Sequence, residues 1–264
     1  MHVSEPFESA EFSIRRAVKH AVDFHTLAAK FVNGESYTTR DEFNAETGLN
    51  EIKVKLVRDF PEDLRGSLSD AIKNIRDSLD QAVSAATLVV TGKRRSRTHF
   101  PFGESEDDLE NSLSRRKAAQ CKDIPEEIFP AIRFIRPYPH EGDSFRLKTL
   151  QRVSGPHKHS VSLSLGCSPA YGFSEVTLNT GDPSTSITIN FPEWDSSKEE
   201  VVVATYAPKS GGRAILSHAF YIAVDHPELR NIPASVVLEG WGRRADWVVQ
   251  GLKKFAAQVV AERG

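Results

Sequence analysis

The chain has few cysteines and no long hydrophobic run. Its 264 residues contain two cysteines, Cys121 and Cys167, which lie far apart and lack the Cys-x-x-Cys or Cys/His spacing of a zinc site. Two thiols in a chain of this size are typical of a reducing compartment, so we expect both to be reduced. No window approaches the roughly 18 apolar residues that a membrane span needs, and residues 1–12 lack the basic and apolar segments of a signal peptide. The sequence therefore predicts a cytoplasmic protein without a membrane partner.

The chain also lacks an excess of charge of either sign. Lys and Arg total 34 and Asp and Glu total 36, so the formal net charge is −2. Nucleic acid is bound largely through an excess of cations, which this chain does not have overall. A local contact is one alternative, because the basic residues 93–97 precede Phe100-Pro101-Phe102 and so place charge beside stacking rings. The acidic run 104–110 favours the other alternative, a solvated loop.

Helical periodicity dominates the chain as far as residue 160. Apolar residues recur every three or four positions from Phe12 to Phe31, which predicts a first long helix. Pro61 opens a stronger helix, because proline is favoured at the first helical position. The apolar residues of this second helix form one continuous stripe: Leu64, Leu68, Ala71, Ile72, Ile75, Leu79, Ala82, Val83 and Ala86. Shorter helices are predicted over residues 105–120, 125–137 and 143–153.

Strand-like alternation occurs in two parts of the chain. Residues 36–59 alternate apolar and polar side chains around a turn at residues 46–48, which predicts a hairpin. Residues 161–230 contain roughly five short alternating segments without intervening helices, as in an antiparallel sheet. Helical periodicity returns over residues 234–262, and a sheet with one apolar face needs such a helix as a cover.

These patterns predict an α+β fold. An N-terminal helical region, residues 1–160, contains the hairpin and is followed by the antiparallel β region, residues 161–230. The C-terminal helix, residues 234–262, then covers the sheet. No linker-like segment separates the parts, so residues 1–264 are expected to form one compact unit.

Titratable side chains are concentrated at His157-Lys158-His159. Gly155-Pro156 ends the preceding helix, and in an extended continuation His157 and His159 project on the same side. Two such imidazoles can act as acid and base or contribute to a metal site. No third ligand stands at a fixed spacing, so neither a metal nor a cofactor is expected. The alternative is that the histidines cap the carbonyl end of the helix.

A second candidate lies on the helix after Pro61. Arg76 and Asp80 are i, i+4 neighbours beside the apolar stripe, while Asn74 and Gln81 lie on its other flank. The arginine can hold a phosphate or a carboxylate. The alternative is an ordinary surface ion pair, worth a few tenths of a kcal/mol.

Residues 70–81 (DAIKNIRDSLDQ), followed by Phe100-Pro101-Phe102, Pro137-Tyr138 and residues 147–159, resemble a family of uncharacterised bacterial proteins. In those relatives the helix reads like G-D-x-L-H-N-L-R-S-A-L-D-H and the later motif like L-x-x-L-x-N-x-D-K-H-R. The likeness covers roughly residues 10–165. The family helix contains R-x4-H, which is similar to the signature of HEPN ribonucleases, helical proteins that cut RNA without a metal at a shared dimer face.

The resemblance places the family's arginine on Arg76 and its histidine on Gln81, a departure from the pattern. The sequence as a whole leaves two functions open, of which the resemblance implies only the second. The first is a binding or interaction protein that receives an unknown protein or small ligand on the surface around Arg76 and His157 to His159. The alternative is a HEPN-like RNA-cleaving enzyme, or a degenerate copy of one, with Arg76 on phosphate, His157 or His159 moving the proton, and Asp80 and Lys158 in the same site. A homodimer is compatible with either.

Overall fold

The computed structural model confirms the α+β fold class. It describes residues 5–114, 121–142, 145–155, 165–169, 175–178, 187–189, 194–207, 214–217, 220–229 and 232–263. Residue contacts divide the chain into two units. Unit 1 contains Met1–Asp23, Gly66–Ser162 and Val237–Gly264, and unit 2 contains Phe24–Arg65 and Leu163–Val236. The expected single compact unit and the expected cover of the sheet by the C-terminal helix stay predictions.

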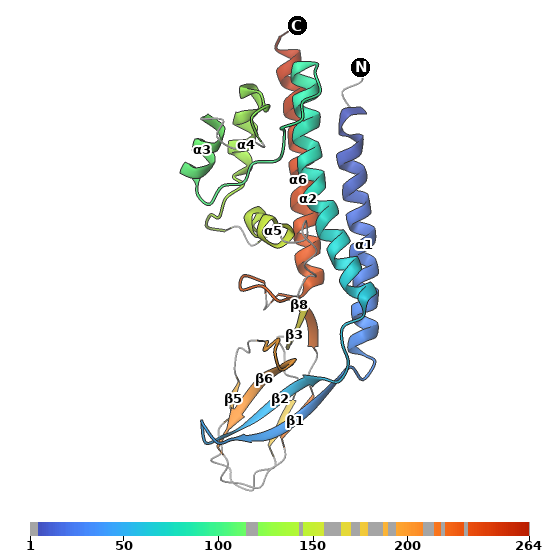
Figure 1. Ribbon diagram of the computed structural model, residues 1–264, viewed down its shortest axis with the longest axis vertical. Helices are drawn as coiled ribbons and strands as arrows, with labels where there is room; N and C mark the ends of the chain where they lie inside the picture. Colours follow the sequence, from blue (N-terminus) through green and yellow to red (C-terminus); the bar gives the residue numbers. More distant parts are fainter. Residues whose placement is uncertain are drawn as a thin grey trace. The chain divides into compact units, whose positions relative to one another are not determined.

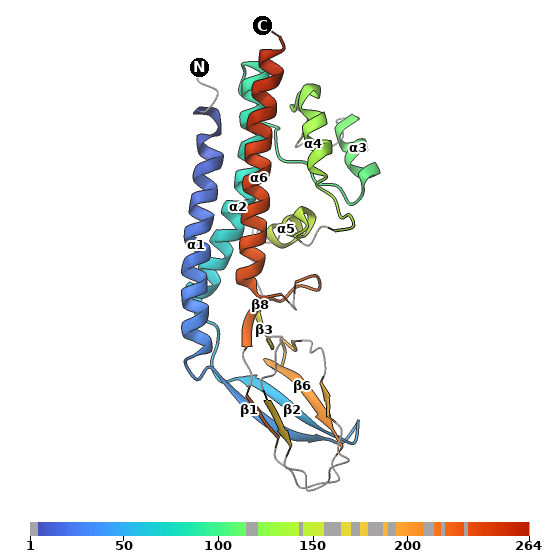
Figure 2. The same cartoon turned by 180° about the vertical axis from the view of Figure 1, so that it is seen from behind.

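Three long helices run side by side in unit 1 (Figures 1 and 2). They are α1 (Glu8–Val32), α2 (Glu62–Thr91) and α6 (Ala234–Ala261). Near the start of α1, Ser13 donates a hydrogen bond to Gln81 near the end of α2 at 3.0 Å, and Glu11 pairs with Lys253 near the end of α6 at 2.6 Å. α1 is therefore antiparallel to both other helices.

The apolar stripe expected on α2 is confirmed. All nine of its residues, from Leu64 to Ala86, are buried. α1 differs, because Phe12, Val18 and Val22 are more than half exposed although they follow the same helical spacing as the buried Ala17 and Phe24. Helical periodicity thus identified both helices, but it identified the buried face of α2 better than that of α1.

The described part of unit 1 also contains short helices. They are η1 (Glu5–Phe7), α3 (Glu106–Ser114), η2 (Glu126–Ile128), α4 (Phe129–Ile135) and α5 (Leu147–Ser154). Arg133 of α4 binds both carboxylate oxygens of Glu110 in α3, at 2.6 and 2.8 Å. α4 ends where Arg136 adopts a left-handed conformation before Pro137, which cannot donate a helical hydrogen bond.

Unit 2 contains a four-stranded antiparallel sheet in the order β1-β2-β6-β5. Its strands are β1 (Tyr37–Asn44), β2 (Leu49–Leu56), β6 (Glu200–Tyr206) and β5 (Ile187–Ile189). The expected hairpin is therefore confirmed as β1 and β2, but it pairs with the later β region. Ile52 and Val54 of β2 share one core cluster with Val201 and Val203 of β6. Burial of these branched side chains favours the long-range pairing.

Two further antiparallel strand pairs belong to unit 2. β3 (Leu165–Pro169) pairs with β8 (Phe220–Val224), and β4 (Glu175–Leu178) pairs with β7 (Ala214–Ser217). Within the described ranges, none of the helices of either unit combines the length and the apolar character needed to cross a bilayer.

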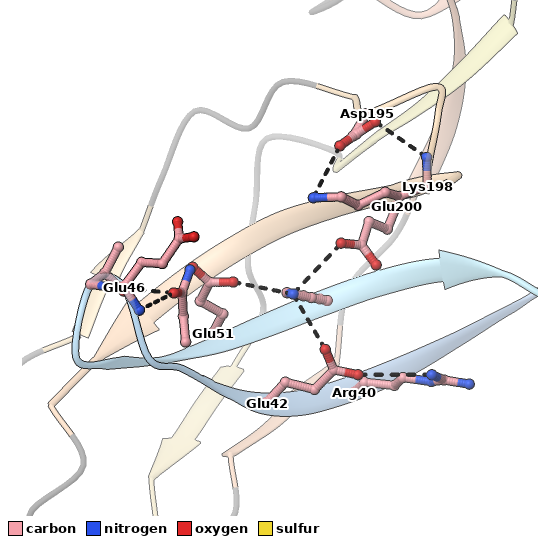
Figure 3. Close-up of polar contacts among 10 residues, drawn as sticks. Arg40, Glu42, Glu46, Glu51, Asp195, Lys198 and Glu200 are labelled. Carbon is pink, nitrogen blue, oxygen red and sulfur yellow. Dashed lines mark hydrogen bonds and ion pairs between the residues drawn. The ribbon is translucent and has the colours of Figure 1, made fainter.

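The side chains of Glu42, Glu51 and Glu200 converge on one point of the sheet (Figure 3). The Nζ atom of Lys53 lies 3.3 Å from Glu42, 3.3 Å from Glu51 and 3.6 Å from Glu200. The Lys53 side chain is only 17% exposed. This partial burial lowers its pKa, but hydrogen bonds to Glu42 and Glu51 and the charge of Glu200 outweigh it, so the pKa of Lys53 is raised. The stabilisation is present below about pH 10.5 and is lost as the pH rises through the raised value.

We expect Lys53→Met to destabilise the protein by about 1–3 kcal/mol at pH 7, because the largely buried carboxylates of Glu51 and Glu200 and the exposed one of Glu42 then lack their shared cation. The difference from wild type should shrink as the pH rises from 7 through the raised pKa of Lys53, above about 10.5, because the neutral lysine no longer supplies that cation. Urea unfolding at pH 7 and above about pH 10.5 measures it. Lys55→Met, on the same strand, is the control. Equal losses in both variants, or a loss at Lys53 that does not depend on pH, would contradict this account.

Candidate functional site

The segment that follows α2, residues 92–104, folds back onto that helix, and we call it the return loop. Asp80 of α2 is the point of attachment. Its Oδ1 atom accepts hydrogen bonds from Nη1 of Arg76 at 2.5 Å and from the backbone N–H of Phe100 at 2.7 Å. Its Oδ2 atom lies 3.1 Å from Nδ1 of His99. We call these groups the Asp80 cluster. The expected contact between Arg76 and Asp80 is confirmed.

Arg76 is largely buried and has a second contact besides its ion pair with Asp80. Its side chain is only 13% exposed, and its guanidinium carbon lies 4.5 Å from the ring centroid of Phe102. The guanidinium is thus held by a carboxylate and by a cation–π contact. Nη1 uses one N–H on Asp80, and the planar group has further N–H donors that suit the oxygens of a phosphate or carboxylate.

The aromatic residues of the return loop belong to the core. Phe100 and Phe102 are 2% and 9% exposed, and their rings pack edge to face with centroids 4.9 Å apart. Rings buried in this way cannot stack on nucleic-acid bases. The stacking surface considered from the sequence is therefore wrong, whereas the basic residues 93–97 are exposed, as a solvated loop requires.

His99 is the residue of this site that sequence reasoning missed. An ionised carboxylate only accepts hydrogen bonds, so Asp80 favours the tautomer whose proton is on Nδ1 of His99. The other ring nitrogen, Nε2, then carries a lone pair, and the His99 side chain is 43% exposed. A histidine oriented by a carboxylate can accept a hydrogen bond or a proton from a ligand. The sequence signal is weak, because His99 stands 19 positions after Asp80 and next to Phe100 rather than at a helical spacing.

Cys121 supports the same loop. Its Sγ atom donates a hydrogen bond of 3.4 Å to the backbone oxygen of His99. Burial raises the pKa of the Cys121 thiol to about 11, the Asp80 charge adds to this, and Arg76 partly opposes it. The thiol is therefore protonated near neutral pH and is a poor nucleophile. Cys167 is also free, and burial raises its pKa to about 12.

The return loop connects the Asp80 cluster to α5. The backbone N–H of Gly103 donates to the oxygen of Pro137 at 3.1 Å. Glu104 pairs with Lys148 at 2.9 Å and with Arg152 at 2.5 Å, both on α5. The hydrogen bond from Lys148 is the main reason that the pKa of Glu104 is lowered. These hydrogen bonds and ion pairs therefore connect, one to the next, the described segments that resemble the family's motifs.

The other residues that the sequence nominated for the site do not belong to the Asp80 cluster as the structure describes it. His157, Lys158 and His159 lie outside the described residues, so their meeting with Arg76 stays a prediction. Asn74 donates to the backbone oxygen of Asp70, one turn earlier in α2. The Gln81 side-chain oxygen accepts hydrogen bonds from two serine hydroxyls of α1, those of Ser9 and Ser13. Gln81, which stands at the histidine position of the motif, therefore connects α1 to α2.

In the described part of the chain, no group of three or more His, Cys, Asp or Glu side chains could hold a metal ion. The functional groups of the Asp80 cluster are a guanidinium, a carboxylate and an imidazole. Comparisons with protein-family models, with curated proteins and with solved structures find no match to this chain. The likeness to HEPN ribonucleases stays a prediction that rests on the motifs given above.

We expect Asp80→Asn to destabilise the protein by about 1–3 kcal/mol, because the amide replaces one acceptor oxygen with a donor and leaves Arg76 without its counter-charge. The measurement is urea unfolding at pH 7. Asp70→Asn, an exposed change on the same helix, is the matched control and should stay within about 0.5 kcal/mol of wild type. Two variants of equal stability would show that the Asp80 contacts contribute little.

Proposed function

We propose that the protein is a cytoplasmic binding protein whose ligand surface centres on the Asp80 cluster. One observation carries the proposal: Asp80 binds Arg76 on one oxygen and His99 on the other, so a donor-rich guanidinium and an imidazole lie next to each other. Arg76 and Asp80 offset each other's charge. Recognition therefore depends on directed hydrogen bonds more than on net attraction.

The chemistry of the two side chains favours a phosphate ester that has a neighbouring hydroxyl. The N–H groups of Arg76 that do not bind Asp80 suit phosphate oxygens, while Nε2 of the half-exposed His99 can accept a hydroxyl proton. A ribonucleotide carries both groups, since its 2′-hydroxyl adjoins the 3′-phosphate. RNA is therefore the ligand class that we propose, with one phosphate and one hydroxyl read at this site.

A short uridine oligomer of about eight nucleotides, within the usual range for single-strand binding, is the probe for this proposal. We expect it to bind more tightly than the matched deoxyuridine oligomer, and His99→Gln to weaken RNA binding about fivefold, the value of one neutral hydrogen bond. Fluorescence anisotropy measures both effects. His20→Gln, on α1, is the control and should bind RNA like wild type. Equal affinity for RNA and DNA, or an unchanged His99→Gln variant, would overturn the proposal.

Cleavage of RNA is the second candidate, and the adjacency of Arg76 and His99 favours it. The family pattern requires an arginine and a histidine, and His99 can supply the imidazole that Gln81 does not. His99 Nε2 would take the proton of a 2′-hydroxyl, and the 2′-oxygen would attack the adjacent phosphorus. The bond to the 5′-oxygen then breaks, and that oxygen takes a proton from water or from His157 or His159. Arg76 would stabilise the charge on the phosphorus oxygens.

We expect a cleavage product that ends in a 2′,3′-cyclic phosphate, detected by mass spectrometry after incubation of the uridine oligomer with the protein. His99→Gln should lose the product, and so should the double variant His157→Ala/His159→Ala if either histidine is the acid. An intact oligomer with wild-type protein would exclude cleavage. That result would leave the binding proposal in place, because binding is measured separately.

A further inference from the structure

A groove lies between α4 and α6 in unit 1, on residues that neither proposal above uses. The two helices are adjacent in both views (Figures 1 and 2), and the groove encloses about 570 Å³. We call it the α4–α6 groove. Its lining residues are Pro130, Ala131, Phe134, Ile135, Trp247, Gln250, Gly251, Lys254, Phe255 and Gln258.

Two large aromatic side chains form the walls of the groove and remain exposed. Phe134 of α4 is 75% exposed and Trp247 of α6 is 42% exposed, and their ring centroids lie 5.9 Å apart. Aromatic residues of this kind are enriched at protein interfaces and commonly supply most of the binding energy. Neighbouring exposed rings therefore indicate a surface that is covered in a complex.

Arg244 fixes the geometry of the two walls. Its guanidinium carbon lies 4.5 Å from the ring centroid of Trp247, and its Nη2 donates to the backbone oxygen of Ile135 at 2.8 Å. The same arginine thus orients the tryptophan and connects α6 to the end of α4. A preformed wall reduces the entropy that a partner must overcome on binding.

Gly251 leaves the floor of the groove open. It stands four residues after Trp247 and four before Phe255, so all three share one face of α6. A Cβ atom added at Gly251 would meet no other atom within 4 Å. Glycine inside a helix costs about 1 kcal/mol relative to alanine, and the packing of this chain does not require it here. The missing side chain instead makes room for a side chain of a partner.

The charges around the groove favour an acidic partner. Lys254 is the only charged residue among its lining residues. Among the described residues, Arg244 contacts a ring and a carbonyl and forms no ion pair with a carboxylate. Asp246 lies at the groove, because its Oδ1 atom is 3.5 Å from Nε2 of the lining residue Gln250. It offsets one of these two positive charges, so these three residues leave a charge of about +1. The α1 face of a second copy fits poorly, because its exposed apolar residues are interspersed with Arg15, Arg16 and Lys19.

The dimensions of the groove suit a helix. The stretch of α6 from Trp247 to Gln258 covers about 17 Å at 1.5 Å per residue, which is three turns. We propose that the α4–α6 groove binds an amphipathic helix of a partner protein, with apolar residues at i, i+4 and i+7 against the two aromatic rings and Gly251, and with Asp or Glu flanking them. This inference is independent of the Asp80 cluster.

The partner helix is defined by its chemistry alone, so panning a random peptide library on the immobilised full chain tests the inference. The displayed peptides should be about 16 residues long, enough for four helical turns. We expect enrichment of peptides that combine helical spacing of Leu, Ile or Phe with Asp or Glu. The best peptide is then synthesised, and its affinity for wild type and variants is measured by calorimetry.

Gly251→Leu is the decisive variant, because it fills the floor of the groove while improving helix propensity. We expect it to weaken the selected peptide at least about tenfold. Gly242→Leu is the matched control, since Gly242 also lies in α6 with no atom within 4 Å of an added Cβ and lies outside the groove. Circular dichroism melts verify that both variants fold. Absence of amphipathic peptides, basic rather than acidic flanks, or equal binding to Gly251→Leu would overturn the inference.

Discussion

The carboxylate of Asp80 is the interaction on which the rest of the site depends. It accepts from a side chain of its own helix, Arg76, and from the backbone and side chain of the return loop at Phe100 and His99. A half-buried carboxylate with three donors is well satisfied, and removing any donor leaves charge or a polar group uncompensated. The return loop is therefore fixed against α2, and the contacts of Cys121, Gly103 and Glu104 extend that arrangement to α5.

Much of the fold follows from periodicity, because burial of one face is a local property of a helix or strand. The stripe on α2, the hairpin and the C-terminal helix from Ala234 could all be predicted in this way. The pairing of β2 with β6 could not, since about 150 residues separate the strands and alternation does not specify a partner. Spacing alone also assigned Phe12 and Val22 to the apolar face of α1, whereas both are exposed.

The candidate site likewise combines contacts that the sequence predicts with contacts that it does not. Arg76 and Asp80 are i, i+4 neighbours on one helix, so their contact could be predicted from the sequence. The part played by His99 depends on how the return loop folds, and no local pattern encodes that. The α4–α6 groove is a similar case, because Phe134 and Trp247 come from helices more than 100 residues apart. Local spacing predicts which residues share an element, while tertiary packing determines which elements meet.

The two proposed surfaces would bind their ligands through different kinds of interaction. The Asp80 cluster offers directed donors and one acceptor to a polar ligand, whereas the α4–α6 groove offers apolar area with a small positive charge. The central claim is that Asp80 determines which ring nitrogen of neutral His99 carries the proton. Long-range ¹H–¹⁵N NMR of the histidine rings tests it most directly. The account predicts that neutral His99 carries its proton on Nδ1 in wild type and loses this preference in Asp80→Asn. A wild-type His99 protonated on Nε2 alone, or a tautomer unchanged by the substitution, would contradict it.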